Sequence, residues 1–184
     1  TRATSPRAAS ASSVAPCRFS QRRIAQSIAF ASESTSHLWI VPTFSIYVAS
    51  RDWMRSRRAE WHDDYTMPSL WKFFAPDRNA HGSYWFDWGT EEEAAWRDNY
   101  RRWMAFVNDY KNHGGLVGAG EDAGYIYSTY GFGYVTELEM LREAGFSPLE
   151  VIKAATLDGA KILGAESEIG AIHFFKRDDL FIVF

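Results

Sequence analysis

Cysteine is almost absent from this sequence of 184 residues, which contains only Cys17. A single cysteine cannot close an internal disulfide, and it cannot supply the several thiolates that a zinc finger needs. These two scaffold classes are therefore excluded. A metal site in this chain would have to use histidine and carboxylate ligands.

An excess of one charge is also missing, because 20 basic side chains face 23 acidic ones for a net charge of −3. Nucleic-acid-binding domains are usually basic, so we expect no nucleic acid partner. The longest apolar runs, residues 38–41 and 181–184, are far below the ~20 residues that span a bilayer. We predict a soluble protein without a membrane partner, cytoplasmic by default, with export left open if an N-terminal part is missing.

Residues 1–36 differ in composition from the rest of the chain. They contain nine Ser, eight Ala and five Arg, and Glu33 is their only acid. So few large apolar side chains cannot offset the entropy of ordering the segment. We predict that it lies outside the fold, as a disordered or non-homologous stretch; its composition also suits a transit peptide.

Tryptophan is abundant in a long segment at about residues 51–89, which lacks a sustained hydrophobic period. Irregular segments of this length are usually functional lids or disordered. Two interpretations remain open: a lid over an apolar pocket, or an aromatic surface of a non-catalytic binding module for sugars or a partner protein. The five tryptophans are Trp53, Trp61, Trp71, Trp85 and Trp88.

Helix signals are clear in the second half of the chain. Thr90 with Glu93 forms a predicted capping box, and a glycine pair after His113 predicts the helix end. A second helix is expected to end at Gly145, and a third, at residues 148–157, begins after Ser147. The apolar side chains at helical spacing in the first of these helices are Trp96, Tyr100, Trp103, Val107 and Tyr110.

Two short apolar runs predict strands: residues 37–43 a buried strand, and residues 116–122 a tightly packed strand that ends at Asp122. The order strand, loop, helix, repeated once, is typical of an α/β fold with a parallel sheet. Functional groups in such folds lie at the carboxyl ends of the strands, where Asp122 ends the second run between Gly120 and Gly124. Asp122 is therefore the leading candidate, although an Asp before Ala-Gly also commonly shapes a turn.

Several motifs in order resemble the C-terminal part of the amidohydrolase superfamily, the metal-dependent hydrolases that include imidazolonepropionase-like and prolidase-like enzymes. Residues 120–124 (GEDAG) resemble the motif that ends barrel strand eight, and residues 137–148 (ELEMLREAGFSP) its following helix. Residues 154–164 (AATLDGAKILG) are similar to the next signature. The runs IGAI at 169–172 and DLFIV at 179–183 resemble the closing strands.

This resemblance implies that residues 37–184 are the C-terminal part of an amidohydrolase-related domain. The implied fold is α/β and partly TIM-barrel-like, with the last two βα units, strand seven at residues 39–43, and the C-terminal β strands of the small composite domain. The implied activity is hydrolysis of amide or cyclic amide C–N bonds in a small molecule. Asp122 would be a ligand of a divalent metal, zinc by preference, with one or two ions in the complete enzyme, and would also act as the base.

The resemblance also has limits. A complete (β/α)₈ barrel takes roughly 250 residues, so strands one to six and their metal-binding histidines are not expected in this chain. We expect the chain by itself to be inactive and to retain no metal. Glu121 replaces the family's Thr or Ser and is a weaker candidate for a substrate or solvent-facing residue. His81, in the aromatic insertion, is expected over the barrel mouth. An aromatic-rich binding module or an inactive truncated product remains the alternative.

Overall fold

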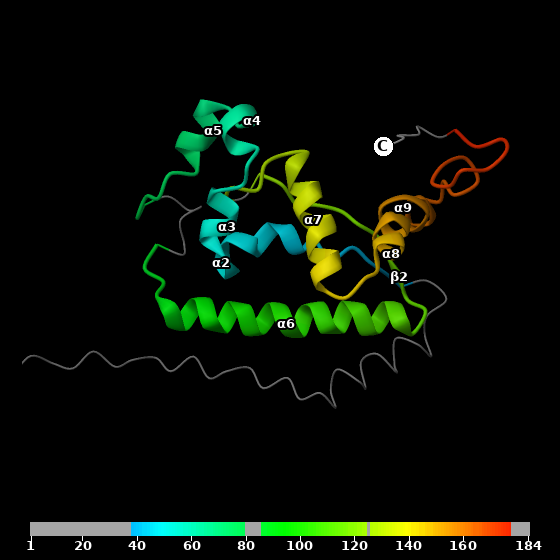
Figure 1. Ribbon diagram of the computed structural model, residues 1–184, viewed down its shortest axis with the longest axis horizontal. Helices are drawn as coiled ribbons and strands as arrows, with labels where there is room; N and C mark the ends of the chain where they lie inside the picture. The colour runs from blue at the N-terminus through cyan, green and yellow to red at the C-terminus, as the bar shows by residue number, and fades with distance from the viewer. Residues whose placement is uncertain (1–37, 80–85, 125, 178–184) are drawn as a thin grey trace, which may run out of the picture.

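The computed structural model describes residues 38–79, 86–124 and 126–177. This part of the chain is mostly helical and contains one pair of short parallel strands (Figure 1). Three predictions concern residues outside it: the exclusion of residues 1–36 from the fold, the position of His81, and the closing strand at residues 179–183. The described part has a mixed α/β architecture in which helices dominate.

The parallel pair joins β1 (Trp39–Ile40) to β2 (Leu116–Val117), with Trp39 opposite Leu116 and Ile40 opposite Val117. Both strands are shorter than the predicted runs of residues 37–43 and 116–122. On the β1 side, Pro42 has no N–H to donate to a ladder, and Thr43 has a left-handed backbone with φ of 48°. The prediction of longer strands was therefore wrong.

Beyond β2 the backbone finds a different partner. Gly118 N still donates to Ile40 O at 2.9 Å, but Ala119 N donates to Ala154 O at 3.2 Å, on the helix of the next unit. The predicted burial of the first strand was also wrong, because Leu38 is 55% exposed and Trp39 is 47% exposed. A sheet with two described strands has too few neighbours to cover both of its faces.

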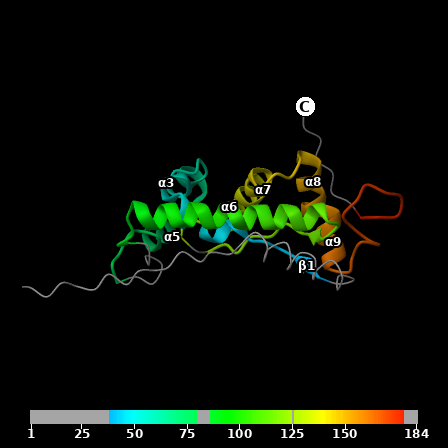
Figure 2. The same ribbon diagram turned by 90° about the horizontal axis from the view of Figure 1, so that it is seen from below.

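The longest helix, α6 (Thr90–Asn112), runs the length of the described part, from the insertion helices at one end to α9 at the other (Figure 2). It begins one residue earlier than the predicted capping box implies: Gly89 is the N-cap, and its N–H donates to Glu92 Oε2 at 2.8 Å. Gly114 follows its end with φ of 88°, as predicted. The residues of its buried face are Tyr100, Met104, Val107 and Tyr110, flanked by half-buried Trp96 and Trp103.

Two tyrosine hydroxyl groups tie this helix to the chain around β1. Tyr100 donates to Phe44 O at 2.6 Å, and Tyr110 donates to Leu38 O. Both side chains also belong to the main hydrophobic core, which continues through Met140 and Phe146. The long helix therefore holds the segment around β1 by core packing and by two hydrogen bonds, one to Leu38 before the strand and one to Phe44 after it.

The second unit continues from β2 through α7 (Phe132–Glu143) to α8 (Pro148–Lys153). The predicted capping box is confirmed: Glu150 N donates to Ser147 Oγ at 3.3 Å, and Ser147 N donates to Glu150 Oε2 at 2.8 Å. The helix does not end at residue 157 but continues through a π-helical turn, η3 (Ala154–Asp158), into α9 (Gly159–Ile162).

A closing strand was predicted at residues 169–172, and the structure has none there. The segment forms bends, and Gly170 has φ of 89°. The physical reason is the lack of a partner, because neither edge of the β1–β2 pair reaches this segment. No helix in the described part of the chain is both long enough and apolar enough to cross a membrane.

The aromatic insertion contains more regular structure than its sequence predicts. The chain passes through η1 (Phe44–Tyr47) and α2 (Val48–Arg51) into the short helices α3 (Trp53–Arg57), α4 (His62–Tyr65) and α5 (Pro68–Phe73). In Figure 1 these last two helices lie on the far side of α3 from α6. They surround a second hydrophobic cluster that contains Ala49, Phe74, Ile126 and Tyr127, with Trp53, Leu70 and Trp71 packed against it.

Candidate functional site

Asp122 lies in the loop that follows β2, beyond the carboxyl ends of both strands. It is exposed, and its carboxylate forms no hydrogen bond or ion pair with any residue that the structure describes. The flanking glycines allow close contacts, as predicted. A Cβ on Gly120 would lie 2.7 Å from Val41 Cγ1, and Gly124 has φ of 100° with the Tyr130 hydroxyl nearby.

Glu121 is half-buried, and its two carboxylate oxygens differ in environment. Its Oε1 accepts a hydrogen bond from Gly131 N at 3.0 Å, just before α7. Its Oε2 is buried without a hydrogen-bond partner, and a Cβ on Gly133 would lie only 2.3 Å from that oxygen. One carboxylate oxygen is therefore buried, while the hydrogen bond of the other lies at the exposed surface; a contact between Glu121 and substrate stays a prediction.

Glu137, on α7, is the most buried carboxylate in the described chain, with none of its surface exposed. Its Oε2 accepts a hydrogen bond from Ser45 N at 2.7 Å, and its Oε1 has no partner. Burial raises the pKa of Glu137 to about 7, against the opposing effect of the Ser45 and Phe44 amides and the Ser45 hydroxyl. The charge of Glu121 raises the pKa further.

Glu137 is not among the residues predicted from the sequence, although its place on the apolar face of a predicted helix could have indicated it. The buried positions of α7 include Met140 and Leu141, and a residue three or four positions earlier lies on the same helix face. A glutamate at position 137 therefore interrupts an apolar stripe. A charged residue at such a position needs a partner that the local sequence cannot identify.

The insertion covers the loop that follows Asp122. Trp71 and Phe74 contact the Tyr127 ring at centroid distances of 5.2 and 5.6 Å, and Trp61 stacks on Phe132 at 5.4 Å. A cavity of about 640 Å³ lies between α3 and α7 and is lined by Ser128, Thr129 and Gly133, among others. The loop after β2 therefore lines a cavity that residues of the insertion cover.

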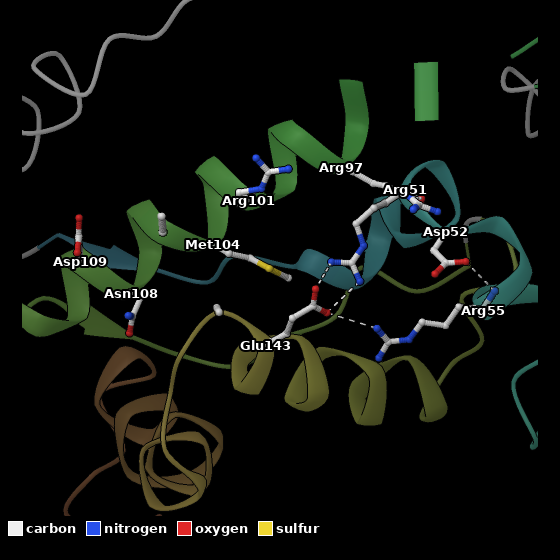
Figure 3. Close-up of a pocket in the computed structure, with 11 residues that line it drawn as sticks. Arg51, Asp52, Arg55, Arg97, Arg101, Met104, Asn108, Asp109 and Glu143 are labelled. Carbon is white, nitrogen blue, oxygen red and sulfur yellow. Dashed lines mark hydrogen bonds and ion pairs between the residues drawn. The ribbon is translucent and has the colours of Figure 1, made fainter. Parts of the chain in front are cut away.

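A second cavity, of about 680 Å³, lies between α6, α7 and the α2–α3 corner (Figure 3). In Figure 3 the Glu143 carboxylate faces Arg51 and Arg55; it accepts two hydrogen bonds from Arg51, at 2.7 and 2.9 Å, and one from Arg55 at 3.4 Å. The hydrogen bond from Arg51 is the main cause that lowers the pKa of Glu143. These guanidinium groups clamp α2 and α3 onto α7, so we interpret the cavity as structural.

The described histidines, His62, His113 and His173, are engaged in local hydrogen bonds. His62 is buried in the aromatic cluster, with Nδ1 2.8 Å from Thr66 Oγ1 and Nε2 2.7 Å from Ser56 O. His113 contacts the backbone at Asp109 O, and His173 that at Phe174 O. The described residues contain no group of three His, Cys, Asp or Glu side chains that could hold a metal ion. This donor set does not by itself fit a catalytic metal.

In the structure, Glu121 is half-buried against the segment before α7, Glu137 on α7 is fully buried, and Asp122 is exposed. His81 lies outside the described residues, so its place relative to Asp122 stays a prediction. No protein family, no curated protein and no solved structure matches this chain.

Proposed function

We propose that this chain forms the C-terminal part of a metal-dependent hydrolase related to the amidohydrolase superfamily, acting on amide or cyclic amide C–N bonds of a small molecule. The observation that supports the proposal best is the position of Asp122. An exposed carboxylate without a hydrogen-bond partner in the described chain, beyond the carboxyl end of a parallel strand, lies where α/β enzymes place their functional groups.

The pairing of the strands adds to this support. β1 and β2 are parallel neighbours, and each is followed by helical structure that packs on the same core. This arrangement is the one expected of the last two βα units of a TIM-like barrel. The insertion, which roofs the loop after Asp122, is consistent with a lid over a substrate pocket.

Asp122 would be one metal ligand and not a complete site. Zinc sites in enzymes use three or more protein ligands, and no such group is present in the described residues. The remaining ligands would have to come from βα units outside this chain. The metal would activate water for attack on the amide, and this chain's contribution is a carboxylate held at the strand end by two close-packed glycines.

The first test measures metal content. The purified chain, dialysed against metal-free buffer, should hold well under one equivalent of zinc by elemental analysis, because one carboxylate cannot replace a site with three or more ligands. Stoichiometric zinc that survives dialysis would contradict the proposal that most ligands lie outside the chain.

The second test measures turnover in a protein that joins this chain to six preceding βα units. Asp122→Asn should lower amide hydrolysis by at least about a hundredfold, because the variant removes both a ligand and a general base. Asp109→Asn is the matched control, since Asp109 is exposed on α6 away from the strand ends. Equal turnover in the Asp122 variant with unchanged metal content would assign Asp122 to a turn-shaping role.

The alternative, an aromatic binding module, lacks a comparable observation. The insertion tryptophans that the structure describes, Trp53, Trp61, Trp71 and Trp88, are half-buried in contacts with other aromatic rings. Their faces are therefore partly occupied by internal packing. Saturable binding of a sugar or a partner protein in metal-free buffer, lost on substitution of these tryptophans, would favour this alternative.

A further inference from the structure

Two carboxylates, that of the fully buried Glu137 and that of the half-buried Glu121, share an unusual arrangement of their oxygens. Glu121 and Glu137 each accept a backbone N–H through one oxygen, from Gly131 and Ser45 respectively. In each case the second oxygen is buried and has no hydrogen-bond partner in the described chain. A buried, unpaired carboxylate oxygen is costly, so both groups lack a partner of the kind that proteins normally supply.

Hydroxyl groups without partners surround the same place. Ser128 Oγ and Glu121 Oε2 converge on Gly133: a Cβ there would lie 3.0 Å from the hydroxyl oxygen and 2.3 Å from the carboxylate oxygen. Ser128 is 5% exposed, and its hydroxyl has no hydrogen-bond partner in the described chain. The Ser45 hydroxyl lies close enough to Glu137 to lower its pKa, yet it makes no hydrogen bond of normal geometry.

These groups come from three segments, which are joined by the hydrogen bond from Ser45 N to Glu137 Oε2 and by the close approach of the Glu121 carboxylate to Gly133. Ser45 is on η1, Glu121 and Ser128 are on the loop after β2, and Glu137 is one helical turn after Gly133 on α7. The two carboxylates are near enough for the charge of Glu121 to raise the pKa of Glu137.

We propose that Glu121, Glu137 and the hydroxyls of Ser45 and Ser128 bind a hard divalent cation of the calcium type. All four groups offer oxygen, and two carboxylates balance a charge of +2. Calcium accepts six to eight oxygen ligands in flexible geometry, whereas zinc prefers nitrogen and sulfur, which are absent from these side chains. The ion would tie the loop that carries Asp122 to α7 and η1.

The cavity between α3 and α7 adjoins the Ser128 side of this site. Its wall includes Ser128 and Gly133, the two residues against which the Glu121 carboxylate lies. Because Gly133 has no side chain, no Cβ atom stands between the backbone that lines the cavity and the Glu121 carboxylate. The site differs from the proposed catalytic ligand, because Asp122 is exposed whereas the unpaired oxygen of Glu121 is buried.

The test titrates Ca²⁺ into the chelator-treated chain at pH 7.5, with isothermal calorimetry and thermal unfolding as the two readouts. We expect one ion per chain and a midpoint of unfolding that rises with Ca²⁺ concentration. Glu121→Gln and Glu137→Gln should each weaken binding at least about tenfold, since calcium affinity depends on the number of charged ligands. Zn²⁺ should not displace Ca²⁺ in competition.

Two controls separate this site from other effects. Glu139→Gln changes an exposed α7 carboxylate that pairs with Arg55, and Asp122→Asn changes the proposed catalytic ligand; both should bind Ca²⁺ as the parent chain does. The proposal is overturned if the chain binds no Ca²⁺ at millimolar concentration, or if Glu121→Gln retains full affinity. The Glu121 variant decides the question even if Glu137→Gln does not fold.

Discussion

Glu137 shows how a single buried carboxyl couples stability to pH. Its pKa rises from 4.5 to about 7 because burial disfavours the charged form. The groups facing it are the Ser45 amide and hydroxyl on η1, Glu121 on the loop, and Tyr134 on α7. Burial raises the pKa of Tyr134, and the charges of Glu137 and Glu121 raise it further. Between pH 4.5 and 7 the unfolded chain releases this proton before the folded chain does.

The sign of the effect follows from this difference. Stability conferred by the neutral carboxyl is fully present below pH 4.5 and is lost as the pH rises through about 7, by roughly 3 kcal/mol for this single group. Glu137→Gln should therefore flatten the fall in the free energy of unfolding between pH 5 and 8, measured by urea denaturation with chelator present. Glu139→Gln should show the same fall in the free energy of unfolding between pH 5 and 8 as the parent chain. An unchanged slope in Glu137→Gln would mean that Glu137 is not the group that titrates.

At the scale of elements, the N-terminus of α8 depends on one side chain. Ser147 caps the helix, and Glu150 returns the hydrogen bond to the Ser147 amide. The Lys111 ammonium on α6 is the main cause that holds the pKa of Glu150 at about 2, so the same carboxylate also links two helices.

Removing the cap should cost about 1 kcal/mol, the usual effect of replacing an N-cap serine by alanine. The expected result is a lower urea midpoint for Ser147→Ala with an unchanged slope. Ser167→Ala, a change at an exposed turn position, is the matched control. A loss no larger than that of the control would show that neighbouring packing, and not the cap, sets the start of α8.

At the scale of the whole molecule, the short sheet is the least protected feature. Neither outer edge of the β1–β2 pair meets another strand among the described residues, and Leu38, Trp39 and Val41 are exposed around it. Unpaired strand edges next to apolar side chains favour association between chains. Further βα units, as the proposed function requires, would cover the same surface.

We therefore expect the chain to self-associate with rising concentration, as measured by sedimentation velocity. Leu38→Lys should reduce this association, because a charge beside a strand edge opposes edge-to-edge pairing. Leu149→Lys is a useful comparison, since Leu149 is 77% exposed on α8 and belongs to neither strand. Equal effects of the two variants would point to a general gain in solubility instead of a blocked edge.

Local signals in the sequence determined the helices well. The glycine after α6, the capping serine of α8 and the spacing of the α6 apolar face all act within a few residues, so the sequence alone predicts them. The position of Asp122 between two close-packed glycines beyond a strand also followed from local order. The proposed function rests on these features.

Only the tertiary structure decided the lengths of the strands, the helices within the insertion, and the burial of one carboxylate oxygen of Glu121. The clearest case is Glu137, whose anchor is the Ser45 amide, 92 positions earlier in the chain. A strand extends only as far as a partner pairs with it, and a carboxylate is buried only where distant segments meet around it. Periodicity describes which face of an element is apolar, but it does not say which remote residue will cover that face.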